Sequence, residues 1–320
     1  MIPAAAFCAI MFLASCPQNS DGYGDSINVV SVNARELIAP AYGEQDSAAK
    51  AVAAGANDFA FRLSAGLVKK AGNDNFVCSP YSAWLPLAAL VNATNSQNKA
   101  ALITALGASG ISESDINRSA SRMLYSLTNL QDKDGEDYHN PLKIANAIFI
   151  GNTVTLRQDF AQTFMDYFLG SSINVDFSSP SAVDAVNRWA SNNTDGLIKD
   201  IIKEFDPETV AAIANAIYFS DRWEWEFRPG ETKEGVFHAP AGNSTAFYML
   251  REGDAQTYYE DSRIQATSLR FKNGGGLYVM LPKSLSAADL LASMTNKYFS
   301  DIQTNSVQAT GKLLLPRFSI

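Results

Sequence analysis

The stretch AAIANAIYF, residues 211–219, decides the fold of this 320-residue chain. Eight apolar residues surround one amide side chain, that of Asn215. An apolar run of this length, with no polar residue recurring every 3.6 positions, predicts a strand that is buried on both faces. A buried amide whose hydrogen bonds are unmade costs about 1–3 kcal/mol. Asn215 therefore needs specific partners, and a polar point inside a sheet is a candidate switch.

A second stretch, IANAIF at residues 144–149, nearly repeats IANAIY at residues 213–218. Two apolar strands that each carry a central asparagine indicate neighbours in one sheet. The similarity is too short for a repeat architecture, and coincidence remains as the alternative.

The composition indicates a globular protein and argues against one class of partner. Hydrophobic residues make up 47% of the chain and charged residues 18%, with a formal net charge of −8. Proteins that bind nucleic acid need clustered Lys and Arg to neutralise phosphates, and the longest basic run is Lys69-Lys70. We therefore expect no nucleic-acid partner.

The residues that commonly carry catalysis or metal binding are few. Three cysteines (Cys8, Cys16 and Cys78) cannot form a disulfide framework. The two histidines, His139 and His238, lie far apart in sequence and lack nearby residues at metal-ligand spacing. The sequence thus predicts no metal, no cofactor and no Cys/His or Ser/His catalytic pair, so we expect a protein that is not an enzyme.

The N-terminus has the pattern of an export signal. Residues 1–15 form an apolar run that is too short to span a bilayer as a helix, and small residues follow it. Its end, Leu13-Ala14-Ser15-Cys16, is similar to a bacterial lipobox, in which the cysteine receives the lipid. The run departs from the usual signal because no Lys or Arg precedes it. An ordinary signal peptide with an incidental Cys16 is the alternative.

Residues 16–45 contain several Pro and Gly residues among polar ones and predict a flexible tether. The N-terminal pattern therefore predicts an exported protein, held at a bacterial cell envelope as a lipoprotein or released as an extracellular one. Residues 46–320 would then form the folded domain.

The first strong helix is predicted over residues 46–70, because Phe59, Leu63 and Leu67 recur every four positions. After it, residues 75–78 predict a short apolar strand in which Cys78 would be a buried, inert thiol. A helix then opens at Ser79-Pro80, with proline in the first turn, where its missing N–H costs nothing. Ser79 and Ser82 are well placed to cap this helix.

Several motifs together resemble those of the serpin family. Asn215 and the residues that follow it match the family at Trp223, Phe227, Thr232 and Phe237. Further motifs occur in the family's order: Asn75-x-x-x-Ser79-Pro80-x-Ser82, Asn187-x-Trp189, Thr194-x-Gly196-x-Ile198 and Leu313-x-Leu315-Pro316-x-Phe318. Each motif alone is weak, but their joint order over about residues 46–320 is specific.

The resemblance implies an α+β, multidomain serpin-like fold. About eight or nine helices would pack around a large central mixed sheet and smaller sheets. Residues 46–320 would be the N-terminal portion of the serpin domain, incomplete at its C-terminus. The family places its reactive-centre loop further on, so the resemblance implies a loop that lies beyond Ile320.

The resemblance also implies a function, inhibition of serine-type endopeptidases, with cysteine proteases as a second target class. In the family, the cleaved reactive loop inserts into the central sheet and distorts the attached protease. By position, Ser79, Ser82 and Asn215 match the shutter, a polar network that lets strands separate. Trp223 and Thr232 match the breach, where the loop first enters the sheet. Core packing and helix capping are the alternative roles, most of all for Trp223.

Two other functions stay open at this point. One is a non-inhibitory binding protein on a serpin scaffold, and the other is an inactive fragment at the cell envelope. Fold alone does not choose among them.

Overall fold

The computed structural model describes residues 5–14, 36–40, 46–72, 74–129, 141–206, 208–239 and 242–318. No helix in these ranges is long and apolar enough to cross a membrane.

The first sheet has four strands in the order β1-β4-β2-β3. They are β1 (Ala5–Ala14), β4 (Thr209–Phe219), β2 (Leu142–Gly151) and β3 (Gly170–Val175). β4 is antiparallel to both β1 and β2, whereas β2 and β3 are parallel, so the sheet is mixed. Asn146 lies directly opposite Asn215 in the register of β2 with β4. The expectation that the two similar stretches are neighbours in one sheet is therefore confirmed.

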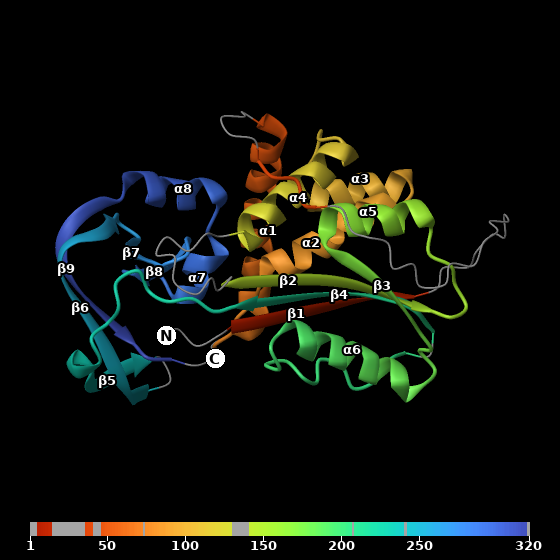
Figure 1. The fold of residues 1–320 in the computed structure, drawn as a ribbon. Helices are drawn as coiled ribbons and strands as arrows, with labels where there is room; N and C mark the ends of the chain where they lie inside the picture. The colour runs from red at the N-terminus through yellow and green to blue at the C-terminus, as the bar shows by residue number, and fades with distance from the viewer. Residues whose placement is uncertain are drawn as a thin grey trace.

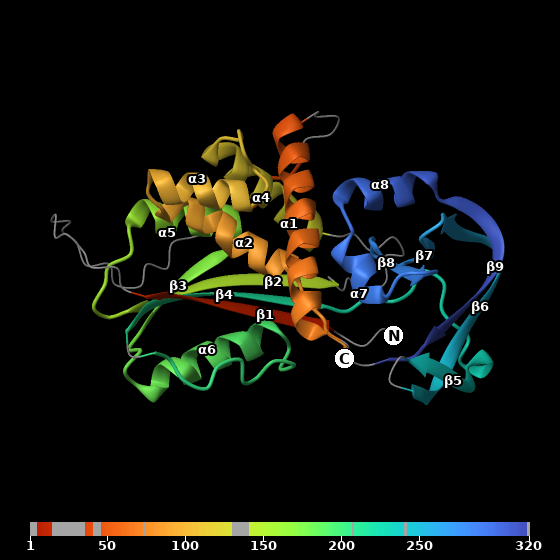
Figure 2. The same cartoon turned by 180° about the vertical axis from the view of Figure 1, so that it is seen from behind.

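Helices cover both faces of this sheet (Figures 1 and 2). One face carries the helices of the N-terminal half, which are α1 (Ser47–Ala71), α2 (Pro80–Leu90), α3 (Ser96–Ala105), α4 (Glu113–Thr128) and α5 (Gln158–Phe168), with the 3₁₀ turn η1 (Val91–Ala93) after α2. The other face is covered by α6 (Pro180–Asn193).

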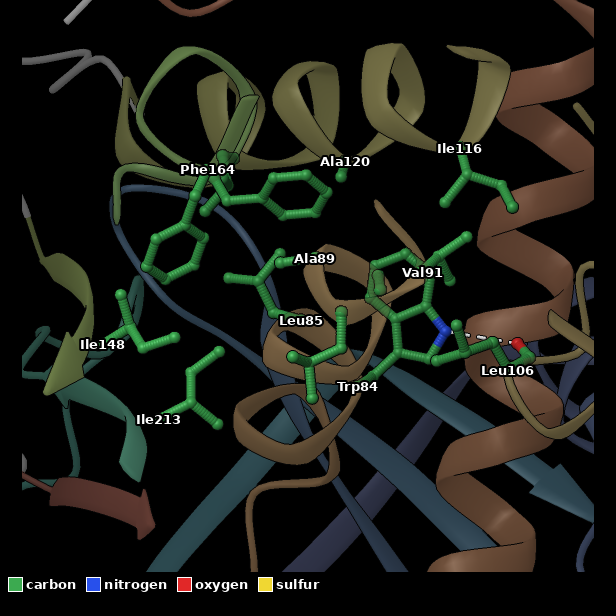
Figure 3. Close-up of a cluster of buried hydrophobic side chains, with 14 of the residues drawn as sticks. Trp84, Leu85, Ala89, Val91, Leu106, Ile116, Ala120, Ile148, Phe164 and Ile213 are labelled. Carbon is green, nitrogen blue, oxygen red and sulfur yellow. Dashed lines mark hydrogen bonds between the residues drawn. The ribbon is translucent and has the colours of Figure 1, made fainter. Parts of the chain in front are cut away.

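Alternation along β4 supplies both faces of the core. Ile213 points toward α2 and α5, where Leu85 and Phe164 lie with it in one apolar cluster (Figure 3). Ala212 and Ala214 belong to a second cluster on the side of α6, together with other apolar residues. Because both faces are covered, the apolar run needs no polar residue every second position.

The second sheet is antiparallel and lies beside the first (Figure 1). Its strands are β5 (Lys233–Ala239), β6 (Gly242–Glu260), β7 (Ile264–Arg270), β8 (Gly276–Pro282) and β9 (Val307–Pro316), in the order β5-β6-β7-β8 with β9 also paired to β6. The 3₁₀ turn η2 (Pro229–Glu231) precedes β5. α7 (Ala287–Ala292) and α8 (Asn296–Asn305) pack on this sheet through Ile264, Leu290 and Ile302.

The α+β class is confirmed, with eight α-helices in the part of the chain described. The helix predicted over residues 46–70 runs from Ser47 to Ala71. It ends at Gly72, whose φ of 61° is easily reached only without a side chain.

The strand predicted at residues 75–78 is wrong. These residues form no strand, Val77 is 56% exposed, and Cys78 is only partly buried. No other described segment pairs with this backbone. The apolar residues at 75–78 therefore have no neighbouring strand with which to form backbone hydrogen bonds.

The N-terminal segment takes a defined place in the backbone. Residues 5–14, which the sequence assigns to an export signal, form β1 along the outer edge of β4. Residues 15–35 and 41–45 lie outside the described residues, and with them Cys16 and most of the predicted tether. The export signal, the lipid site and the tether stay predictions.

Candidate functional site

The candidate site is the outer edge of β4 and the polar point at its centre. On one side β4 pairs with β2, and on the other it pairs antiparallel with β1 from Ala5↔Phe219 to Ala14↔Thr209. The register with β1 is regular except for an irregularity between Leu13 and Ala14. The edge of β4 that faces away from β2 therefore accepts an antiparallel strand of ten residues.

The polar centre is a pair of buried amides. Asn215 Nδ2 donates to Asn146 Oδ1 at 2.9 Å and to Ala145 O at 3.4 Å, and Asn146 Nδ2 donates to Phe168 O. Both asparagines are at most 1% exposed. Asn215 Oδ1 has no hydrogen-bond partner among the described residues, and an unmade buried acceptor costs about 1–3 kcal/mol. The pair thus ties two strands to the end of α5 while leaving one acceptor unpaired.

The two serines predicted for the shutter lie together at the start of α2. Ser79 is the N-cap, and its Oγ accepts from the backbone N–H of Ser82 at 3.3 Å and from Ser82 Oγ at 2.9 Å. Ser82 is 2% exposed. Within the described residues no hydrogen bond joins either serine to Asn215. The structure thus brings the serines together as a helix cap and places Asn215 separately, with Asn146.

Asn146 is the site residue that sequence reasoning did not assign. Its signal was present, because the repeated stretch placed a second asparagine at the centre of a neighbouring apolar strand. Only the register shows that the two amides meet.

The predicted breach residues lie beyond the end of β4. The ring of Trp223 stacks on Phe271 with 5.1 Å between centroids and meets Phe227 edge-on at 5.9 Å. Thr232 is partly buried and its N–H donates to Pro229 O at 3.2 Å, which closes η2. No hydrogen bond in the described part of the chain joins Trp223 to Thr232. Trp223 therefore has an aromatic packing role in this structure, and its role as an entry point stays a prediction.

A buried carboxylate fixes the backbone next to Trp223, and no local sequence pattern marks it. Asp221 is 4% exposed, and its Oδ1 accepts from the Arg222 N–H at 2.7 Å and from Asn273 Nδ2 at 3.0 Å. Its Oδ2 accepts from the Asn273 N–H at 3.3 Å. These bonds tie the end of β4 to the turn between β7 and β8, which carries Phe271 close to Trp223.

Side chains from the Asn-x-Trp motif hold α6 over the sheet. Asn187 Oδ1 accepts from the N–H groups of Ile201 and Ile202 at 2.9 and 3.1 Å, and its Nδ2 donates to Ile202 O at 2.9 Å. Trp189 meets Phe149 of β2 edge-on, with 6.1 Å between centroids. The helix that crosses the sheet is thereby fixed both to its own following loop and to β2.

The described residues of the site present a strand edge that is paired with β1. Among the described residues no three His, Cys, Asp or Glu side chains gather in a way that could hold a metal ion. His238 is exposed and its Nδ1 lies 2.8 Å from Asn243 Oδ1, whereas His139 lies outside the described residues. What the site offers is a sheet edge that takes an added strand, with a polar centre beside it.

Comparison with known proteins gives a consistent result. The family described as "Serpin (serine protease inhibitor)" matches residues 54–320. An uncharacterized serpin-like protein of Thermococcus kodakarensis is 29% identical over 197 residues, which are 61% of this chain and 46% of that protein. A serine protease inhibitor of Mus musculus is 26% identical over 273 residues, which are 82% of this chain and 63% of that protein. The chain thus spans about half to nearly two thirds of the length of these relatives.

Solved structures share the fold. Cleaved kallistatin in complex with heparin aligns with a TM-score of 0.76 at 20% identity, covering 85% of this chain and 81% of that one. The native state of tengpin, a thermophilic serpin, aligns with a TM-score of 0.73 at 23% identity, covering 90% of this chain and 70% of that one.

Proposed function

The chain belongs to the serpin family, and from that premise we propose that the full-length protein inhibits serine-type endopeptidases by inserting a cleaved reactive-centre loop beside β4. One observation carries this proposal: the outer edge of β4 pairs with a ten-residue antiparallel strand, β1. An inserted loop would need the same edge, the same direction and a similar length.

The energetics favour such an insertion. Each ladder hydrogen bond contributes about 0.5–1.5 kcal/mol net, and a strand added to a sheet edge gains both these bonds and side-chain burial. A state with an exposed loop would therefore be less stable than the inserted state. The active inhibitor would be held by a kinetic barrier.

The chemistry belongs to the protease. Its serine oxygen attacks the scissile carbonyl of the loop, the C–N bond breaks, and the new amine leaves with a proton while an ester joins loop and protease. Insertion of the loop then pulls the ester-linked protease across the inhibitor. A displacement of about 1 Å in a catalytic site costs on the order of a hundredfold in rate, so water hydrolyses the ester slowly.

The amide pair would act as a gate in this mechanism. Asn215 and Asn146 lie at the centre of the strands that must adjust when a new strand enters. Because Asn215 Oδ1 has no partner among the described residues, a rearrangement that brings a donor to it would recover the cost of the unmade hydrogen bond. The Ser79–Ser82 cap would hold the start of α2, which packs on the face of the first sheet that carries Ile213.

The test is a search for covalent complexes. The full-length protein without residues 1–15 is incubated with trypsin, chymotrypsin and subtilisin, and a 1:1 complex that survives SDS is expected with at least one of them. The chain that keeps residues 1–15 is the matched control, because β1 covers the receiving edge, and it should form less complex. A protein that is cleaved in its loop, forms no complex and gains no heat stability would instead be a non-inhibitory scaffold that binds other ligands.

We also propose that export frees this edge. The Leu13-Ala14-Ser15-Cys16 pattern supports removal of residues 1–15 and lipidation of Cys16 at a bacterial envelope, with two or more acyl chains needed for firm anchoring. Mass spectrometry of the protein from membranes should find a lipid on Cys16 as the first residue. Cys16→Ala should abolish this modification, and an unmodified mature N-terminus in the wild type would leave only an ordinary signal peptide.

A further inference from the structure

The turn between β7 and β8 contains the one Asn-Gly pair in the sequence, Asn273-Gly274. In such a pair the backbone nitrogen of the glycine attacks Cγ of the asparagine. The amide nitrogen leaves as ammonia and takes the proton of the glycine N–H with it. The five-membered imide that forms then adds water and opens to aspartate or isoaspartate. Glycine favours this ring closure because no Cβ restricts its backbone, so the sequence marks Asn273 as the asparagine most prone to deamidation.

In the folded chain both reacting groups are held by hydrogen bonds. Asn273 Nδ2, the leaving nitrogen, donates to Asp221 Oδ1 at 3.0 Å, and the Asn273 N–H donates to Asp221 Oδ2 at 3.3 Å. We call these two bonds the Asp221–Asn273 clamp. The attacking nitrogen of Gly274 donates to Phe271 O at 3.4 Å. Ammonia cannot leave, nor the Gly274 nitrogen close the ring, without breaking these bonds, so the clamp protects the amide.

The clamp is buried but lies close to solvent. Asn273 is 8% exposed and Asp221 is 4% exposed, whereas Gly275 and Gly276, which follow directly, are exposed. Asn273 Oδ1 has no partner in the described part of the chain, so the side chain is held through Nδ2. A local opening of the turn therefore releases the amide and admits water. Such openings need less free energy than global unfolding.

The product of the reaction does not fit the clamp. Deamidation replaces the NH₂ group, whose nitrogen lies 3.0 Å from Asp221 Oδ1, by a carboxylate oxygen. Two buried carboxylates at this distance repel each other and have both lost water. Isoaspartate also lengthens the backbone of the turn by a methylene group. Because the clamp joins the end of β4 to the turn that carries Phe271 close to Trp223, its loss would free both segments.

We propose that Asn273 is a deamidation site that the Asp221–Asn273 clamp protects, and that deamidation keeps the turn between β7 and β8 open once it has opened. The reaction needs only water as a co-reactant. The proposal is independent of protease inhibition.

The rate of deamidation tests the protection. The full-length protein is kept at mildly alkaline pH and digested with trypsin, and mass spectrometry follows the peptide after Lys272, residues 273–283. Protein unfolded in urea gives the unprotected rate, and native wild type should react at least about tenfold more slowly. Asp221→Ala should react about tenfold faster than native wild type, the factor for the loss of about one hydrogen bond. Asp221→Asn, which keeps the shape and one acceptor oxygen, should fall between them.

A matched control separates the clamp from overall stability. Leu290→Ala removes a buried side chain of α7 and leaves the clamp intact. It should leave the rate at Asn273 unchanged. Acceleration by Leu290→Ala equal to that by the Asp221 variants would show that global unfolding governs the reaction and would overturn the proposal.

The effect of the product is tested with two variants of the full-length protein. Asn273→Asp makes the product directly, and Asn273→Ala removes the amide without adding a charge. Asn273→Asp should lose protection from hydrogen exchange at residues 219–224 and 270–276, and Asn273→Ala should lose less. Deamidation of native wild type at the unfolded rate, an unchanged rate in both Asp221 variants, or equal exchange in the two Asn273 variants would each overturn the proposal.

Discussion

The two sheets of this molecule differ in how their faces are covered. The first sheet has helices on both faces, and from Ala211 to Ile217 its strand β4 is at most 6% exposed. The second sheet leaves large apolar side chains in contact with solvent, among them Phe237 at 42%, Phe247 at 53% and Leu281 at 63%. The number of strands in a sheet is thus a poor guide to its contribution to stability. That contribution depends on how far helices bury the side chains on each face.

The two sheets also present different kinds of surface. Exposed apolar groups on the second sheet mark a face that other protein surface would cover. The exposed feature of the first sheet is a backbone edge, since β4 needs a partner strand on the side away from β2. The second sheet therefore offers a surface for side-chain contacts, whereas the outer edge of β4 offers backbone groups that pair with a strand.

The largest expected effect follows from exposing both features at once. Residues 46–320 produced alone lack β1 and keep the open face of the second sheet. They should aggregate or bind 1-anilinonaphthalene-8-sulfonate strongly, measured by light scattering and dye fluorescence. Phe237→Ser with Phe247→Ser should lower the dye signal, since both lie on the paired strands β5 and β6. A soluble monomer with a sharp, reversible unfolding transition and no dye binding would show that the edge of β4 and the face of the second sheet are not exposed in this fragment.

The next prediction sets the same residue type in the two regions against each other. Phe164 is 0% exposed and packs so closely that a Cβ added to Gly170 would lie 2.3 Å from its ring. Phe164→Ala in the full-length protein should reduce the free energy of unfolding by about 3–5 kcal/mol. Phe237→Ala should cost less than about 1 kcal/mol, because Phe237 is already 42% exposed.

Urea denaturation of both variants measures this difference. If they lose the same stability, then either the second sheet is covered in solution or the helix face of the first is looser than the packing indicates.

A smaller effect is expected from the amide pair at the centre of the first sheet. Asn215→Ala should cost about 1–3 kcal/mol, because it leaves Asn146 Oδ1 buried without its donor. A second pair gives the control: Asn92 and Asn117 exchange two side-chain hydrogen bonds, at 3.0 and 2.8 Å. Double-mutant cycles to alanine should therefore give a larger coupling for Asn92–Asn117 than for Asn146–Asn215. Equal or reversed coupling would remove the argument that the sheet pair is the weaker point.

Much of this architecture follows from the sequence where one local cause dominates. The apolar run around Asn215 and its near-copy around Asn146 predict two buried neighbouring strands, because neither run has a polar residue recurring every 3.6 positions. The predicted helix over residues 46–70 differs by one residue at each end from the observed α1, Ser47–Ala71. Its end is predictable because Gly72 can take a positive φ. The strand predicted at residues 75–78 is wrong because a strand needs a neighbouring strand, and the local sequence does not show whether one lies beside these residues.

The candidate site is less predictable for the same reason. Ser79 and Ser82 are recognisable as a cap from local spacing, but their separation from the Asn215 amide depends on how α2 packs. The bonds of Asp221 to Asn273 join residues 52 positions apart, and no local pattern marks them. Contacts between residues far apart in the chain are the part of the site that the sequence does not predict.

The smallest effect is a pH dependence that differs between the two regions. The Ala49 N–H bond lowers the pKa of Asp46 at the start of α1, burial opposes this, and Arg122 and Arg118 add to the lowering. In the second sheet, the hydrogen bonds of Lys283 and Tyr258 lower the pKa of Glu260. A carboxyl whose pKa is lower in the folded chain stabilises it above the ordinary pKa, which is about 4, and this stabilisation is lost as pH falls through the folded value.

Urea midpoints measured from about pH 6 to about pH 3 should therefore fall more steeply for the wild type than for Asp46→Asn, which keeps the cap, and than for Glu260→Gln. Asp46→Asn should flatten the curve more, because the Asp46 side chain is 11% exposed and that of Glu260 is 44% exposed, where water screens the ion pair. If Glu260→Gln flattens it more, charge pairing on the second sheet contributes more to stability than its open face indicates.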